Sequence, residues 1–96
     1  MDKIIGLAYR ARKITIGTEM TIDSLRKKKL YAIVLANDAS QLTIKKVRDK
    51  AKTYETPVLD DLDSLTLSNA IGKTDIKVIG ITDKGFSQLL IDQKRK

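Results

Sequence analysis

The residues best suited to chemistry surround a glycine near the N-terminus. A β-branched run at 14–16 leads into Gly17, and a helical apolar pattern begins after Thr18. This order predicts a helix whose first-turn N–H groups lack intrahelical partners and point outward. The cations that precede the turn are Arg10, Arg12 and Lys13. Backbone donors beside positive charge predict an anion site, for which phosphate is a common ligand. The alternative is that Gly17 is only a turn residue.

Other residue types offer little for catalysis. The chain has no cysteine and no histidine, which excludes disulfides, Cys/His zinc sites and catalysis by either side chain. The segment Asp60-Asp61-x-Asp63 could form a magnesium site, but such clusters usually serve as loop and helix-cap residues. We therefore expect no enzyme activity, no metal and no cofactor.

The composition favours a small domain with a polyanionic partner. The chain has 96 residues, 42% hydrophobic and 4% aromatic, so we expect one domain, 1–96, with an aliphatic core. The 19 basic and 12 acidic residues give a net charge of +7, which favours nucleic acid as a partner. A basic protein without such a partner is the plain alternative. We see no signal peptide and no apolar run of membrane length, and we expect a soluble cytoplasmic protein.

Apolar spacing predicts helices that alternate with strands. The helices are expected at 2–12, 18–28, 41–54, from Asp63 or Ser64 to 71, and from Asp83 onward. The strands are expected at 13–16, 30–36, 57–59 and 76–82. The unbroken apolar run 30–36 indicates a strand buried on both faces. We therefore predict a single-domain α/β protein, a three-layer α/β/α sandwich over a small four-stranded mixed sheet, with 93–96 a frayed tail. Tyr54 and Phe86 fall on apolar faces and are expected in the core.

Four motifs give the chain a family resemblance. They are GLAYRARK at 6–13, LANDAS at 35–40, AIGK at 70–73 and TDKGF at 82–86. In order and spacing they resemble the bacterial YlxQ-like proteins of the ribosomal L7Ae/L30e superfamily, the kink-turn RNA binders. The resemblance covers almost the whole chain. It implies recognition of a sharply bent RNA duplex by the helix N-terminus at Gly17.

The resemblance also implies three contact regions with flanking cations. At the turn, Gly17, Thr18 and Thr21 fit the family pattern, whereas Glu19 and Met20 depart from it. The loop after the central strand and the loop after the short helix would hold an extruded nucleotide. The implied RNA-binding residues are Arg12, Lys13, Gly17, Thr18, Glu19, Met20, Thr21, Asp23, Lys27, Asp38, Ser40, Ile44, Lys73, Thr74, Asp75 and Ile76.

Several substitutions weaken the positive field implied for this site. Asp23 replaces a lysine, Asn69 replaces a cation, Asp75 adds a carboxylate, and Ser68 stands where the family usually has glycine. Losing one phosphate contact reduces the salt slope by about one and costs roughly a kcal/mol. Other cations at 27–29 could replace such contacts, or they could only complement the end of a helix.

We therefore expect a non-enzymatic RNA-binding protein associated with ribosomal or other structured RNA. The alternative is a protein-interaction module that keeps the fold but has lost kink-turn binding. Met20 and Ile22 would then be exposed apolar contacts for a protein partner or for weak self-association. A third interpretation, an accessory domain related to RNA methyltransferases, would need a separate catalytic partner because the chain has no cofactor motif.

Overall fold

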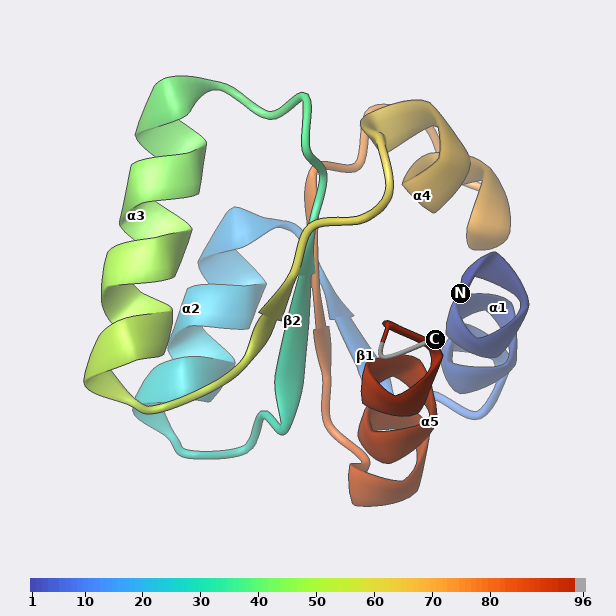
Figure 1. Ribbon diagram of the computed structural model, residues 1–96, viewed down its shortest axis with the longest axis horizontal. Coiled ribbons are helices and arrows are strands. Elements are labelled where there is room, and N and C mark those ends of the chain that lie inside the picture. The colour runs from blue at the N-terminus through green and yellow to red at the C-terminus, as the bar shows by residue number, and fades with distance from the viewer. Residues whose placement is uncertain (95–96) are drawn as a thin grey trace.

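The computed structural model describes residues 1–94, in which five helices alternate with four strands (Figure 1). This order of elements was predicted, but several ends differ by a few residues. The first helix ends before residue 12 because the chain turns at Arg12, whose φ is 60°. Gln93 and Lys94, expected in a frayed tail, belong to the last helix, while residues 95 and 96 lie outside the described part. The elements are α1 (Asp2–Arg10), β1 (Ile14–Ile16), α2 (Thr18–Arg26), β2 (Ala32–Leu35), α3 (Gln41–Thr53), β3 (Val58–Leu59), α4 (Ser64–Ala70), β4 (Val78–Ile81) and α5 (Lys84–Lys94).

Strand β4 organises the sheet because it pairs with a strand on each side. The strand order is β1-β4-β2-β3. β4 runs antiparallel to β1, with Ile16 opposite Ile79, and antiparallel to β2, with Leu35 opposite Val78. β2 and β3 are parallel, so the sheet is mixed, as predicted. All four residues of β2 are buried, as expected for the apolar run in which this strand lies.

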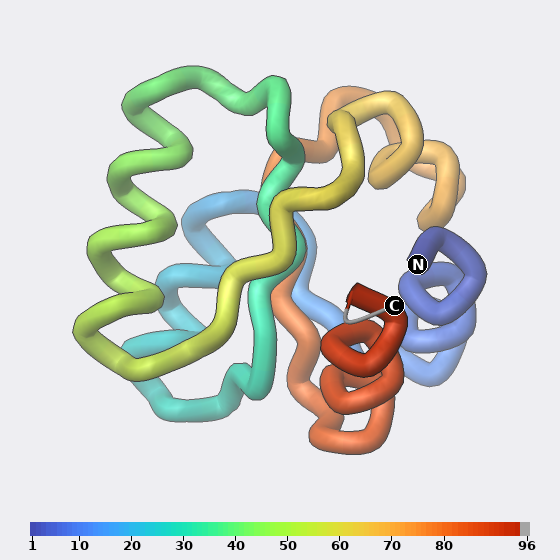
Figure 2. Tube along the Cα trace, in the orientation of Figure 1, coloured from blue at the N-terminus to red at the C-terminus, as the bar shows by residue number. Residues whose placement is uncertain are grey.

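Two hydrophobic cores lie on opposite faces of the sheet, under the two helical layers that Figures 1 and 2 show. On one face α1, α4 and α5 bury Ile5, Leu67 and Leu90 completely. On the other face α2 and α3 contribute Leu25 and Val47. Alternate residues of β2 belong to the two cores, since neighbouring side chains of a strand point to opposite faces. The predicted three-layer α/β/α sandwich is confirmed.

The few aromatic side chains differ in their surroundings. Tyr54 and Phe86 are part-buried against the cores, as predicted, and Tyr9 packs against the core under α1. The Tyr31 side chain is 49% exposed and belongs to neither core. Tyr31 is therefore the aromatic residue whose position packing explains least.

Four helices are each followed by a residue in the left-handed region, a common way for helices to end. In each case the next N–H donates to a carbonyl five residues earlier, as Lys29 N does to Ser24 O at 3.0 Å. Glycine adopts this conformation without strain, whereas a side chain costs on the order of 1 kcal/mol there. The residues are Arg12, Lys28, Glu55 and Gly72, with φ values of 60°, 56°, 53° and 65°.

Substitutions at two of these helix ends are expected to change stability in opposite directions. Lys28→Gly relieves the left-handed strain and should raise the free energy of unfolding by up to about 1 kcal/mol, less the added entropy of glycine in the unfolded chain. Gly72→Ala introduces the strain and should lower it by about 1 kcal/mol. No heavy atom lies within 4 Å of the added Cβ, so packing does not contribute. Urea unfolding measures both changes, and two changes of the same sign would contradict this explanation.

Candidate functional site

The predicted open helix N-terminus is present at the start of α2. Gly17 is the N-cap residue, with φ 92° and ψ 161°, a combination that is almost confined to glycine. Its N–H donates to Val78 O at 2.9 Å, and its carbonyl accepts from Thr21 N at 3.1 Å. No side chain caps the helix. The N–H groups of Thr18, Glu19 and Met20 are thus the first-turn donors that an external acceptor can use.

The other helices that follow a strand begin differently. Ser40 Oγ accepts from Thr43 N at 3.2 Å at the start of α3. Asp63 and Asp83 carboxylate oxygens cap α4 and α5 in the same way, at 2.8 and 2.9 Å. A side chain therefore already occupies the acceptor position at the start of α3, α4 and α5. Among these four helices, the start of α2 is the one left for a ligand.

The three loop regions implied by the family resemblance meet at one end of the sheet. Gly17 N bonds to Val78 O, and Ala36 N bonds to Lys77 O at 2.7 Å, so α2 and the turn after β2 flank the start of β4. We call this end the upper edge, since it lies uppermost in Figure 1. It comprises the first turn of α2, residues 37–44, and the loop 72–77. It therefore brings together eleven residues of the predicted site: Gly17, Thr18, Glu19, Met20, Asp38, Ser40, Ile44, Lys73, Thr74, Asp75 and Ile76.

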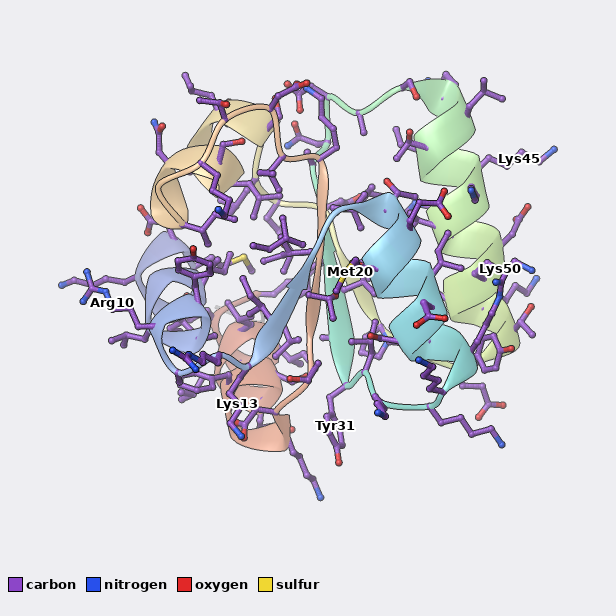
Figure 3. All side chains as sticks on the ribbon, turned by 180° about the vertical axis from the view of Figure 1, so that it is seen from behind. Arg10, Lys13, Met20, Tyr31, Lys45 and Lys50 are labelled. Atoms are coloured by element: carbon purple, nitrogen blue, oxygen red, sulfur yellow. The ribbon has the colours of Figure 1, made fainter. Side chains whose placement is uncertain are left out.

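The predicted cations other than Lys73 lie elsewhere. Lys13 precedes β1, at the opposite end of the strand from Gly17. Its backbone carbonyl accepts from Thr82 N at 2.8 Å. Three residues of strand span about 10 Å, and Figure 3 shows Lys13 at that far end. Lys27 follows the nine-residue helix α2, about 13 Å from its start. The interpretation that Arg10, Arg12 and Lys13 lie beside the helix N-terminus was therefore wrong, because β1 separates them from it.

The acidic departures from the family pattern are each paired with a lysine. Glu19 lies 3.2 Å from Lys46 Nζ, Asp23 lies 3.0 Å from Lys27 Nζ, and Asp75 lies 3.3 Å from Lys77 Nζ. Such exposed pairs contribute little to stability. They do neutralise the carboxylates locally. Because each pair is neutral overall, the carboxylates also cancel the charge of these lysines, and the positive field at these positions is weakened, as the sequence suggests.

Two residues expected at the surface are buried. Thr21, implied as an RNA contact, is fully buried, and its hydroxyl lies 2.9 Å from that of Thr15. This hydroxyl pair joins α2 to β1, so Thr21 fixes the helix from inside and its side chain is not available to a ligand. Ile22, expected as an exposed protein contact, is only 3% exposed. Met20, by contrast, is 62% exposed, in agreement with that expectation.

Sequence reasoning missed two exposed leucines beside this site. Leu42 is 83% exposed in the first turn of α3, and Leu65 is 69% exposed in the first turn of α4. Ser64, next to Leu65, donates hydrogen bonds to the Asp38 carboxylate at the upper edge. Leu42 falls outside the apolar spacing of α3, and this mismatch could have indicated from the sequence that its side chain is exposed.

Hydrogen bonds from short side chains fix the shape of the upper edge. The Asp38 carboxylate accepts from Ser64 Oγ at 2.7 Å and from Ser64 N at 2.8 Å. Ser68, which replaces the family's usual glycine, accepts from Ile76 N at 2.8 Å and so holds the loop before β4. Lys73 places its ammonium 5.9 Å from the centre of the Tyr9 ring, within range of a cation–π contact.

The bonds from Ser64 predict a pH effect at Asp38. The Ser64 hydroxyl, followed by the Ser64 N–H, lowers the pKa of Asp38. The stability that this carboxylate contributes is therefore complete above its unfolded-state pKa, about 3.9, and is lost as pH falls through the lower folded-state pKa. Asp38→Asn should lower the melting temperature at pH 7, and the gap to wild type should close below about pH 4.

Thermal unfolding between pH 7 and pH 2.5 measures this effect. Asp49→Asn is the matched control, since Asp49 is an exposed carboxylate on α3 for which residues 1–94 offer no ion-pair partner within 4.0 Å. A constant gap between Asp38→Asn and wild type across this range would contradict the assigned role of Asp38.

The acidic segment 60–63 has structural contacts. Asp60 pairs with Arg48 at 2.6 Å, Asp61 lies 3.9 Å from Lys94, and Asp63 caps α4. Within residues 1–94 no group of three or more acidic, histidine or cysteine side chains is arranged to hold a metal ion. The same part of the chain contains no helix with the length and apolar character needed to span a membrane.

Comparisons with known proteins agree on one family. Residues 1–91 match the model of the "Ribosomal protein L7Ae/L30e/S12e/Gadd45 family". A protein named RNA-binding protein YlxQ from Enterococcus faecium is 44% identical over 85 residues, which are 88% of this chain and 82% of the relative. The protein of the same name from Bacillus subtilis (strain 168) is 38% identical over 88 residues, 92% of this chain and 88% of the relative.

Solved structures show the same fold. A protein of unknown function from Bacillus halodurans superimposes with a TM-score of 0.95 at 34% identity, covering 99% of this chain and 96% of that one. A 15.5kD RNA binding protein from Giardia lamblia superimposes with a TM-score of 0.83, covering 96% of this chain and 82% of that one. Its identity is 11%, so this second likeness concerns the fold alone.

Proposed function

Because the chain belongs to the ribosomal protein L7Ae/L30e/S12e/Gadd45 family, we propose that it is a non-enzymatic protein that binds structured, kink-turn-like RNA. Family membership agrees with the resemblance of its motifs. The observation that carries the proposal is the uncapped start of α2, which presents the first-turn N–H groups of Thr18, Glu19 and Met20 at the upper edge. Two relatives named RNA-binding proteins support it. We further propose that the protein works in the cytoplasm on ribosomal or other structured RNA.

Recognition would depend on RNA shape. An intact A-form duplex hides its base edges in a deep, narrow groove, whereas a kink exposes them. The first-turn N–H groups of α2 are donors for phosphate or for an exposed guanine edge. The turn that begins at Asp38 and the loop that begins at Lys73 would hold an extruded nucleotide. Asp38 and Ser68 already fix these loops through hydrogen bonds, so little order would have to be gained on binding.

The lysines in and beside the upper edge would meet the RNA backbone. Lys46 and Lys77 are held close to Glu19 and Asp75, and Lys73 lies over Tyr9. A phosphate that approaches the start of α2 competes with an exposed carboxylate for each paired lysine. Exposed ion pairs are weak, so this exchange is inexpensive.

Binding to three RNAs tests the proposal. A labelled kink-turn RNA, the same duplex with a scrambled bulge, and a single strand are titrated at two salt concentrations. We expect tightest binding to the kink-turn, with an affinity that falls as salt rises. Equal and weak binding to all three would overturn the proposal and would attribute the attraction to the net charge of +7.

One observation favours the alternative of a protein-interaction module. The exposed apolar side chains Met20, Leu42 and Leu65 lie in the first turns of three helices. Exposed apolar groups of this kind are common in protein interfaces. This alternative predicts that the three RNAs bind equally, and that replacing Met20 or Leu42 with serine leaves RNA binding unchanged.

A further inference from the structure

We propose a second RNA-binding surface at the opposite end of the sheet, built to take a single-stranded segment. This lower surface consists of Arg12, Lys13, Lys28, Lys29 and Tyr31. The proposal rests on the proposed function, since it assumes that RNA is the partner. It adds a separate site that neither the uncapped start of α2 nor the loops of the upper edge reach.

Backbone hydrogen bonds bring these residues together around the end of β4. Thr82 N donates to Lys13 O at 2.8 Å on one side, and Tyr31 N donates to Ile81 O at 2.9 Å on the other. Lys13 and Tyr31 thus flank the same strand, two strand spacings or about 10 Å apart. Figure 3 shows both side chains at this end of the molecule, directed away from the sheet.

The charge of the lower surface is less balanced than that of the upper edge. Its four cations are exposed, and residues 1–94 supply no ion-pair partner for any of them within 4.0 Å. Two carboxylates lie nearby: Asp83, which follows Thr82 and caps α5, and Glu55, which shares with Lys28 the lining of a hollow of about 410 Å³. The surface therefore has net positive charge where the upper edge has lysine–carboxylate pairs. Such a concentration of positive charge attracts an RNA backbone.

Two of the cations occupy positions that favour glycine. Arg12 and Lys28 both have φ near 60° at the ends of α1 and α2. A cation near a helix C-terminus complements the helix dipole, which is the simplest reason for its presence. However, the equivalent position of α3 holds Glu55, so the geometry accepts either charge. The two cations are therefore not imposed by the backbone, and both face the same end of the sheet.

Tyr31 favours a single strand over a duplex. Its backbone is fixed on both sides, since its N–H donates to Ile81 and its carbonyl accepts from Ser87 Oγ at 3.2 Å. The residue is 49% exposed and belongs to neither core. Unpaired bases stack on exposed aromatic rings beside basic residues, whereas paired bases cannot reach them.

One RNA can reach both surfaces. The molecule measures 28 × 26 × 25 Å, so a kink-turn on the upper edge lies within 30 Å of the lower surface. Even at the stacked spacing of about 3.4 Å per nucleotide, a single-stranded tail of about twelve nucleotides reaches roughly 40 Å, which spans this distance with slack. The second contact would then be intramolecular, and affinity would rise without any new contact at the upper edge.

The test compares a blunt kink-turn RNA, the same RNA with a twelve-nucleotide uridine tail, and the uridine strand alone. We expect the tail to raise wild-type affinity by about tenfold. Arg12→Gly with Lys28→Gly, and separately Tyr31→Ser, should abolish that gain and leave blunt RNA binding unchanged. Glu55→Gly is the matched control, because it makes the same backbone change without removing a cation, and it should keep the gain. Melting temperatures no lower than wild type in the glycine variants exclude unfolding as the cause.

The outcomes separate this proposal from the proposed function. Equal binding of blunt and tailed RNA overturns the second surface while the upper edge stands. Loss of the gain in Glu55→Gly, or loss of blunt binding in the double variant, also overturns it. If blunt RNA does not bind but the uridine strand binds wild type and not the double variant, the proposed kink-turn function fails and the lower surface is supported.

Discussion

Thr18→Asp is expected to weaken binding to kink-turn RNA by roughly ten- to a hundredfold while the protein stays folded. The new carboxylate would lie among the first-turn N–H donors of α2, which no side chain caps in the wild type. It would occupy donors that the RNA needs and would repel a phosphate. Losing a charge-assisted hydrogen bond of this kind costs about 1.5–3 kcal/mol, which corresponds to that range of affinity.

The same substitution should leave stability unchanged or slightly raise it. A negative charge in the first turn complements the helix dipole, so the helix itself tolerates aspartate at this position. Fluorescence anisotropy at two salt concentrations gives the affinity, and thermal unfolding gives the stability. Lys50→Gln is the control, since it changes net charge by the same amount on α3, where Figure 3 shows Lys50 away from α2's start. If a folded Thr18→Asp protein bound the RNA with wild-type affinity, the N-terminus of α2 would not belong to the proposed RNA site.

Gly80→Ala is expected to lower the free energy of unfolding by about 1–3 kcal/mol, the usual cost of overpacking a core. An added Cβ would lie 2.6 Å from Thr15 Oγ1 and 2.8 Å from both terminal methyl carbons of Leu30. Leu30 has rotatable bonds through which it can move. The Thr15 hydroxyl is short and is paired with that of Thr21, so relieving the clash disturbs the contact that joins α2 to β1.

This substitution should therefore also affect the proposed RNA site. We expect weaker kink-turn binding together with the lower stability, because α2 would shift relative to the loops of the upper edge. Chemical denaturation and RNA titration on the same preparation measure the two effects. Gly85→Ala is the matched control: its Cβ meets only the Asp83 carboxylate, at 3.2 Å, and alanine favours the helix in which it lies. An equal loss of stability in both variants would rule out the Thr15 contact as the cause.

The elements were predictable because their local signals agree with the fold. Apolar periodicity located the helices, and the unbroken apolar run around β2 indicated burial on both faces. Gly17 was recognisable as a turn residue at the start of a helix. The structure adds the reason for glycine there, a φ of 92° that other residues rarely adopt. The helix ends were less accurate, since Arg12 and Lys28 turn the chain without the glycine that usually marks such a turn.

Which residues belong to the candidate site was harder to predict, because it depends on contacts between residues that are distant in sequence. Lys13 is only four residues from Gly17 in sequence, yet the strand β1 places the two at opposite ends of the sheet. No local sequence pattern shows that the strand separates them in this way. Thr21 looked like a surface hydroxyl because its partner, Thr15, lies on another element. Likewise, Glu19 looked unpaired because Lys46 is 27 residues away in sequence.

A lysine that already touches a carboxylate enters a complex by exchange, and this affects how many contacts an experiment would count. When Lys46 or Lys77 moves to a phosphate, Glu19 or Asp75 is left to attract a dissolved cation. The cation taken up by the carboxylate offsets the counterion that the RNA phosphate releases. The slope of log affinity against log salt would then fall short of the number of lysines on the RNA, by about two for these two pairs.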